Sequence, residues 1–206
     1  MNKEQEKKTK EKRIIATFLK SNSLDFELLE LAEAQSIFPI YTGENPDVIV
    51  FNGKEYVGIE LFTLSLKKSR KVNPEFKNFH HRQNQFPQKI NNHNLGAHTD
   101  ALHRYGLASH DNLEEILLER ISEKIDLLSR YCTEKVWFIG HATEIAHQTG
   151  LVEEIMEDGI EENLKKSFLS KISIPPRVEK IILFETGTSE KSYTFYLKDS
   201  TCYSFV

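Results

Sequence analysis

Two carboxylates, those of Asp47 and Glu60, stand thirteen residues apart in a stretch that otherwise consists mostly of β-forming residues. Asn52-Gly53, between two runs of such residues, is a strong signal for a two-residue type I′ turn, so residues 46–63 are predicted to form a β-hairpin. Pairing about that turn makes the two carboxylates diagonal neighbours on one face, about 5–7 Å apart at Cβ. Such carboxylates in buried strands need a positive partner, and Mg²⁺, which binds oxygen ligands and phosphate together, is one candidate.

The remaining residues of the predicted hairpin divide between its two faces. The face opposite the carboxylates is apolar and consists of Val48, Val50, Val57, Ile59 and Leu61. Gly58 is expected directly across from Asp47, where its missing side chain would leave space for a ligand. The alternative to a metal site is that each carboxylate pairs with a nearby lysine or caps a strand end at the rim of the sheet.

A cation that could serve the two carboxylates is Lys124. Residues 113–132 are predicted to form a helix, and Lys124 falls within its apolar stripe of Leu117, Ile121, Leu128 and Tyr131. A lysine in a core-facing stripe needs an acidic partner, which the face with Asp47 and Glu60 can provide. The alternative is that the side chain extends to the edge of the helix and reaches water.

The segment from residue 24 to about 35 is predicted to be a helix with Ser23 as its N-cap. It offers further carboxylates near the proposed site. Periodicity does not choose between them, and Glu30 is slightly favoured as an additional metal ligand over Glu27 and Glu33.

The elements that must position these residues alternate between helices and strands along the chain. Besides the hairpin and the helix of Lys124, we expect helices at 4–20 and 151–171 and strands at 37–41, 135–141, 178–185 and 192–197, with a last edge at 202–206. This order predicts an α/β fold with a mixed sheet. The length of 206 residues suits a single domain spanning 1–206.

The net charge of −4 is distributed unevenly. Residues 67–110 hold eight Lys/Arg against two acids and also six of the eight histidines, whereas residues 21–66 hold one lysine against eight acids. Residues 1–20 are basic and residues 111–206 acidic. The chain therefore combines an acidic core with a basic, His- and Asn-rich insertion that follows the hairpin.

This insertion is predicted either to be a solvated surface segment or to contact the phosphates of a nucleic acid, since clustered Lys/Arg supply the sequence-independent part of such binding. Its histidines match no standard zinc-finger spacing. The candidate nucleic-acid contacts are Lys67, Lys68, Arg70, Lys71 and Arg82.

Several classes of protein are disfavoured. The sequence has no apolar run of about 18 residues, so we expect no membrane partner. The first thirteen residues lack the apolar stretch of a secretory signal, so we expect a cytoplasmic protein. The two cysteines, Cys132 and Cys202, form no CxxC motif. A Walker loop, a GxGxxG motif and a GxSxG nucleophile elbow are all missing.

Residues 46–50 (PDVIV) and 58–61 (GIEL) together resemble the motif of the PD-(D/E)xK nuclease superfamily, in its bacterial members. The resemblance covers residues 24–140 in its order of helix, hairpin, helix and strand, although about twenty residues carry the motif itself. It implies a restriction-endonuclease-like fold in which Asp47 and Glu60 hold a catalytic metal, Mg²⁺ or Mn²⁺.

One motif position departs from that family. The lysine expected two residues after Glu60 is replaced by Phe62. The resemblance implies that Lys124 takes its place, as related families move this lysine to the same helix. The leading hypothesis is therefore a metal-dependent endonuclease with Asp47, Glu60 and Lys124 as catalytic residues and DNA as the expected substrate. The alternative is a nuclease-like protein that binds nucleic acid or a protein without cutting. A homodimer is compatible with either.

Overall fold

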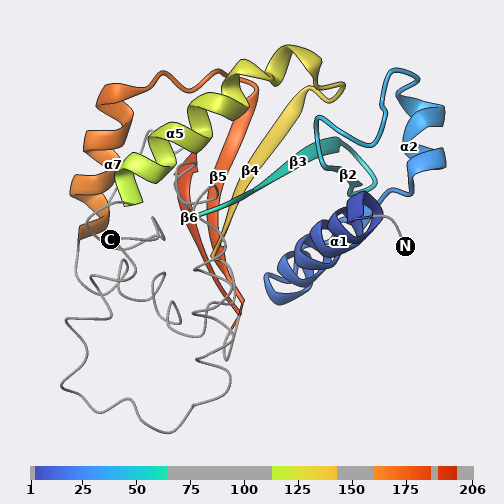
Figure 1. The fold of residues 1–206 in the computed structure, drawn as a ribbon, viewed down its shortest axis with the longest axis horizontal. Helices are drawn as coiled ribbons and strands as arrows, with labels where there is room; N and C mark the ends of the chain where they lie inside the picture. Colours follow the sequence, from blue (N-terminus) through green and yellow to red (C-terminus); the bar gives the residue numbers. More distant parts are fainter. Residues whose placement is uncertain (1–2, 65–112, 143–159, 187–189, 199–206) are drawn as a thin grey trace, which may run out of the picture.

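The computed structural model of the chain describes residues 3–64, 113–142, 160–186 and 190–198. In these residues six strands form one mixed sheet in sequential order (Figure 1). They are β1 (Glu27–Leu28), β2 (Val48–Phe51), β3 (Tyr56–Thr63), β4 (Lys135–Ala142), β5 (Val178–Glu185) and β6 (Lys191–Leu197). β3, β4 and β5 are parallel, and the outer strands pair antiparallel. The predicted α/β class with a mixed sheet is confirmed.

Helices cover both faces of this sheet (Figure 1). On one face, Ile15, Phe18 and Leu19 of α1 (Lys3–Ser21) pack on apolar side chains of four strands. These are Val48 and Val50 of β2, Val57 and Ile59 of β3, Trp137 and Ile139 of β4, and Ile182 and Phe184 of β5. On the other face lie α5 (Leu113–Asp126) and α7 (Ile160–Lys171), whose apolar residues share a core with Phe138 and Leu183. Central strands buried on both sides explain the nearly continuous apolar runs in β4 and β5.

The hairpin forms as predicted, but its register differs. Val48 pairs with Ile59 and Phe51 with Tyr56, so the turn has four residues rather than two. Asn52 closes it, because its side-chain oxygen accepts hydrogen bonds from the backbone N–H groups of residues 54 and 55, both at 3.0 Å. The shift is an even number of residues, so every side chain keeps its predicted face.

Two predictions for residues 23–41 are wrong. Ser23 has a φ of 50°, outside the range expected of a helix N-cap, and the chain then forms β1 before the short helix α2 (Leu31–Ile37). Residues 38–41 follow α2 as a turn instead of a strand. Packing explains the difference, since Leu29, Ala34 and Tyr41 form a small core with Ile49 and require this compact path.

The predicted helix at 113–132 is α5 followed by a 3₁₀ turn, η3 (Leu128–Arg130). Its predicted stripe, including Leu117 and Tyr131, is buried against the sheet. The predicted helix at 151–171 is confirmed over α7, and residues 151–159 lie outside the described part.

Other predictions fall on residues that the structure does not describe. They concern the insertion 67–110, the candidate contacts Lys67, Lys68, Arg70, Lys71 and Arg82, and the edge at 202–206. Among the described helices, none is both long and apolar enough to cross a membrane.

Candidate active site

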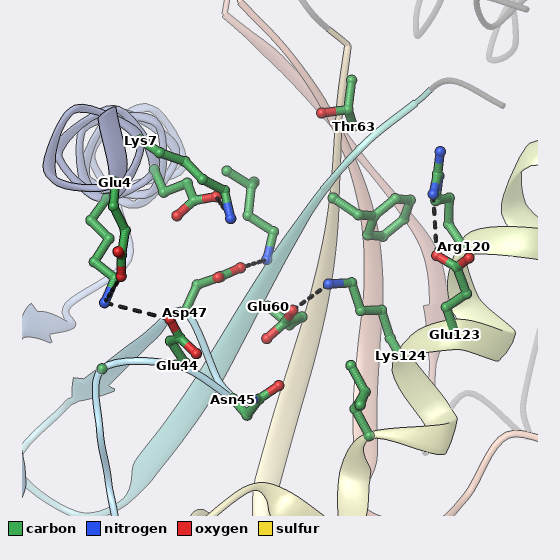
Figure 2. Close-up of a pocket in the computed structure, with 16 residues that line it drawn as sticks. Glu4, Lys7, Glu44, Asn45, Asp47, Glu60, Thr63, Arg120, Glu123 and Lys124 are labelled. Atoms are coloured by element: carbon green, nitrogen blue, oxygen red, sulfur yellow. Dashed lines mark hydrogen bonds and ion pairs between the residues drawn. The ribbon is translucent and has the colours of Figure 1, made fainter. Parts of the chain in front are cut away.

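A cavity of about 460 Å³ opens where the hairpin ends. β2 begins at Val48, opposite Ile59, whereas β3 continues to Thr63, so β3 outruns its neighbour by four residues. The cavity occupies this open edge and lies between α1 on one side and α5 on the other (Figure 2). Its position follows directly from the unequal lengths of the two hairpin strands.

Asp47 and Glu60 both line this cavity. The observed register, continued by one residue, puts Asp47 level with Glu60 rather than diagonal to it. Asp47 Oδ2 accepts a hydrogen bond of 2.8 Å from the backbone N–H of Leu61, on the β3 edge that β2 leaves open. This bond turns the Asp47 side chain toward Glu60, and Figure 2 shows the two carboxylates next to each other.

Gly58 has a different role from the one predicted. It pairs with Ile49, not Asp47. A Cβ at this position would lie 2.8 Å from Cγ of Pro46 and would also meet the hydroxyl of Thr133. The missing side chain therefore accommodates the segment before β2 and the loop before β4, and it leaves no space for a ligand.

Lys124 reaches the site from the last turn of α5. Its Nζ donates a hydrogen bond to Oε1 of Glu60, and the two side chains are 19% and 4% exposed. Glu60 Oε2 is buried and has no hydrogen-bond partner among the described residues. The lysine therefore satisfies one oxygen of the carboxylate, whereas the other makes no well-formed hydrogen bond within the described residues, a costly arrangement in a folded protein.

The pKa of Asp47 also indicates an excess of negative charge in this cavity. Burial first, and then the negative charge of Glu60, raise the pKa of Asp47 to about 6, against the lowering effects of the Leu61 N–H and Lys124. Burial, the charge of Glu60 and the approach of the Tyr131 hydroxyl to Glu60 raise the pKa of Tyr131, although the two groups form no well-aligned hydrogen bond. The site thus holds more negative charge than its own residues neutralise, as in many functional sites.

Glu11 of α1 is a further acid of this cavity and was not predicted. It forms an ion pair of 3.3 Å with Lys7, which also lines the cavity. Burial and the charge of Asp47 raise the pKa of Glu11. Its signal in the sequence was the spacing of Glu4, Lys7, Lys8 and Glu11, which lie on one face of a helix.

Glu30 is not brought to this site. It stands at the N-cap position of α2, where its 79% exposed side chain pairs with Lys12 at 2.9 Å. The predicted helix that would have carried Glu30 toward the carboxylates does not form, so its carboxylate stays near the surface.

Arg120 and Glu123 are further cavity residues that sequence reasoning missed. Arg120 Nη1 lies 3.1 Å from Glu123 Oε2, and its side chain is 4% exposed. It is one turn from Lys124 on α5 and interrupts the same apolar stripe, so the signal that singled out Lys124 applied to it as well.

No family model, curated protein or solved structure matches the chain.

Proposed function

We propose that the chain is a divalent-metal-dependent nuclease that hydrolyses phosphodiester bonds of nucleic acid, with DNA as the expected substrate. This proposal rests on Glu60, a buried carboxylate beside Asp47: one of its oxygens accepts from Lys124, and the other makes no well-formed hydrogen bond among the described residues. A divalent metal ion that also contacts the phosphates of a nucleic acid would provide the positive charge that both carboxylates need.

The residues present fit Mg²⁺ or Mn²⁺. Within the described residues, no three or more His, Cys, Asp or Glu side chains form a ready-made metal cluster. Mg²⁺ commonly uses one or two carboxylates together with waters and substrate phosphate oxygens. Asp47 and Glu60 would hold the ion, which when bound polarises the phosphoryl group and makes water a better nucleophile.

The cations of the cavity would act on the phosphate itself. Lys124 is held beside Glu60, where its ammonium could orient the attacking water or offset the negative charge that develops on the phosphoryl oxygens. Lys7 and Arg120 line the cavity from opposite sides and could position the phosphate. Each is already paired with a glutamate, which fixes its place before substrate binds.

The restriction-endonuclease-like fold is part of the same proposal. In its support, a hairpin is followed by a helix and a parallel strand, and the two carboxylates lie at the edge of that hairpin. Phe62, at the position of the motif lysine, is buried in the core on the α5 side of the sheet. Lys124 then supplies from α5 the amine that β3 lacks.

The second candidate is a protein of this fold that binds without cutting. The Lys124–Glu60 ion pair favours it, because a lysine can replace a metal ion as the counter-charge of a buried carboxylate. In that case neither Mg²⁺ nor Mn²⁺ binds, and no nucleic acid is cleaved.

Cleavage of labelled single- and double-stranded DNA and RNA, with Mg²⁺, Mn²⁺ or EDTA, tests the proposal. We expect metal-dependent cleavage by the full chain, its loss in Asp47→Ala and Glu60→Ala, and nearly unchanged binding of nucleic acid by both variants. Full residual activity in both variants would rule out this site as the catalytic one.

A further inference from the structure

A second cavity, of about 310 Å³, is lined by α1 and the carboxyl ends of β4 and β5. Its polar lining residues are Lys10, Arg13 and Thr17 of α1, His141 of β4, Thr186 after β5, and Glu190. It shares no lining residue with the cavity of Asp47 and Glu60. None of its residues has a role in the proposed reaction.

The two cavities are close neighbours at one edge of the sheet. Thr63 lines the first, and its register partner in β4, His141, lines the second. On α1, Lys7 lines the first cavity and Lys10 the second. Adjacent strands lie about 4.8 Å apart and successive helical turns about 5.4 Å apart. Glu60 precedes Thr63 by three residues on β3, so the second cavity lies about 10 Å farther along the sheet. His141 is on the α1 side of the sheet, whereas Glu60 points toward Lys124 of α5. One strand of nucleic acid that passes over the ends of β3 and β4 could therefore reach both cavities.

The lining of the second cavity suits an anion. It combines two cations with one carboxylate and two hydroxyl groups. Within the described residues, the ion pairs of α1 use Lys7, Lys8 and Lys12, which leaves Lys10 and Arg13 for a ligand. A phosphodiester carries one negative charge and offers acceptor oxygens, which matches this donor set.

A buried histidine lies in this cavity. His141 is 4% exposed, and its Nε2 lies 2.9 Å from Oγ1 of Thr186. Burial and the nearby charge of Lys10 lower the pKa of His141 to about 4, so the imidazole is neutral at pH 7. With its proton on Nε2, His141 donates to Thr186, and the Thr186 hydroxyl can then donate to a ligand.

We propose that this second cavity is a phosphate subsite that holds a further backbone phosphate of the nucleic-acid strand bound at Asp47 and Glu60. Lys10 and Arg13 supply the charge, and Thr17 and the His141–Thr186 pair supply the neutral contacts. The identity of the ligand as nucleic acid rests on the proposed function, whereas the site itself uses separate residues.

The test is binding of a fluorescent oligonucleotide to the full chain in EDTA, where no cleavage occurs. The double variant Lys10→Ala/Arg13→Ala is compared with Lys54→Ala/Arg130→Ala, which also removes one exposed lysine and one arginine but touches neither cavity. We expect the first variant to lose about tenfold in affinity, with a salt slope smaller by about 1, and the second to bind like wild type. Equal affinities of the two variants, or no binding by wild type, would overturn the subsite.

Histidine NMR separates a backbone phosphate from a free anion. The His141 signal, assigned by its loss in His141→Gln, should shift on addition of oligonucleotide and return when Lys10 and Arg13 are removed. A shift with inorganic phosphate but none with oligonucleotide would overturn the backbone assignment and identify a site for free phosphate.

The binding and cleavage assays distinguish an error in the subsite from an error in the nuclease assignment. If the subsite is wrong, Lys10→Ala/Arg13→Ala binds and cleaves as wild type does, while Asp47→Ala is inactive. If the nuclease assignment is wrong, wild type cleaves no nucleic acid or Asp47→Ala cleaves as wild type does, while the loss of binding in Lys10→Ala/Arg13→Ala remains.

Discussion

Two glutamate–lysine clusters, one just before β3 and one within it, differ in their environment. At the start of the strand, Lys135 pairs with Glu55 at 2.5 Å and with Glu179 at 2.9 Å, and these side chains are 42%, 37% and 21% exposed. Toward its other end, Lys124 pairs with Glu60, and these side chains are 19% and 4% exposed. The residue types are the same, but water reaches the first cluster far more easily.

The difference shows how burial separates a structural ion pair from a candidate site. The excess negative charge of the exposed cluster is solvated, and such pairs contribute about 0–1 kcal/mol to stability. In the buried cluster Glu60 Oε2 makes no well-formed hydrogen bond in the part of the chain that the structure describes, and Asp47 lies beside it with a raised pKa. A buried excess of negative charge is unfavourable by itself, and a bound cation would remove it.

The largest expected effect is on the cleavage rate, and it distinguishes Glu60 of the buried cluster from Glu55 of the exposed cluster. Glu60→Gln should lower metal-dependent cleavage by about 10³-fold or more, because a rate factor of ten corresponds to about 1.4 kcal/mol and a lost metal ligand removes several. Glu55→Gln, at the exposed cluster, should stay within about twofold of wild type. Initial cleavage rates at saturating Mg²⁺ provide the measurement. Equal losses in both variants would contradict the distinction between Glu60 as a metal ligand and Glu55 as part of a structural ion pair.

The next largest effect distinguishes Lys124 of the buried cluster from Lys135 of the exposed cluster. Lys124→Met is expected to lower the cleavage rate by about 10²-fold, the usual effect of losing one group that stabilises transition-state charge. Its affinity for Mn²⁺ should not fall, since the ammonium competes with the ion for Glu60. Lys135→Met serves as the matched control and should change neither quantity. A Lys124→Met enzyme as active as wild type would remove Lys124 from the mechanism.

A smaller effect is expected on the stability of the metal-free protein. The pKa of Asp47 is about 6 when folded, against an ordinary value of 3.8. The folded state therefore binds a proton more tightly, and this contribution to stability is present below about pH 4 and lost as the pH rises through about 6. Asp47→Asn should remove that loss and stabilise the protein at pH 7.5 by about 1–3 kcal/mol, since asparagine can still accept the Leu61 N–H.

Urea unfolding in EDTA at pH 4.5, 6 and 7.5 measures this difference. The difference in the free energy of unfolding between Asp47→Asn and wild type should widen with pH. In a parallel series with Mn²⁺ in place of EDTA, the unfolding midpoint should rise for wild type alone. An Asp47→Asn protein that is less stable than wild type at pH 7.5 would show that the ionised carboxylate stabilises the fold.

The smallest effect concerns the exposed cluster. Lys135→Met should reduce the free energy of unfolding by less than about 1 kcal/mol, and high salt should shrink the difference further. A loss of several kcal/mol that does not depend on salt would mean that the exposed cluster contributes as much to stability as the buried one. Burial would then not distinguish the two clusters.

The hairpin and its faces were predictable because side-chain alternation fixes which residues share a face. The register was not, since it depends on the Asn52 side chain, which closes a four-residue turn. The pairing moved by two positions, so Asp47 and Glu60 remained on one face. Lys124 was found because a charged residue within an apolar stripe requires a partner.

Other features depended on tertiary contacts that local patterns do not reveal. Ser23 and the acids after it suggested a helix start, but the packing of Leu29 and Tyr41 onto Ile49 favours β1 and the short α2. Glu30 consequently stays near the surface. Glu11 was missed because the charges of α1 resembled a solvated face, and only the sheet shows that one side of that helix borders the cavity.

Isothermal titration of Mn²⁺ into the full chain and into Glu60→Gln is the most direct test of whether Asp47 and Glu60 hold a metal ion. We expect one binding site in wild type, accompanied by proton release near pH 6 as Asp47 ionises, and no detectable site in Glu60→Gln. Absence of binding by wild type, or equal binding by both proteins, would contradict the claim that Asp47 and Glu60 hold a catalytic metal ion.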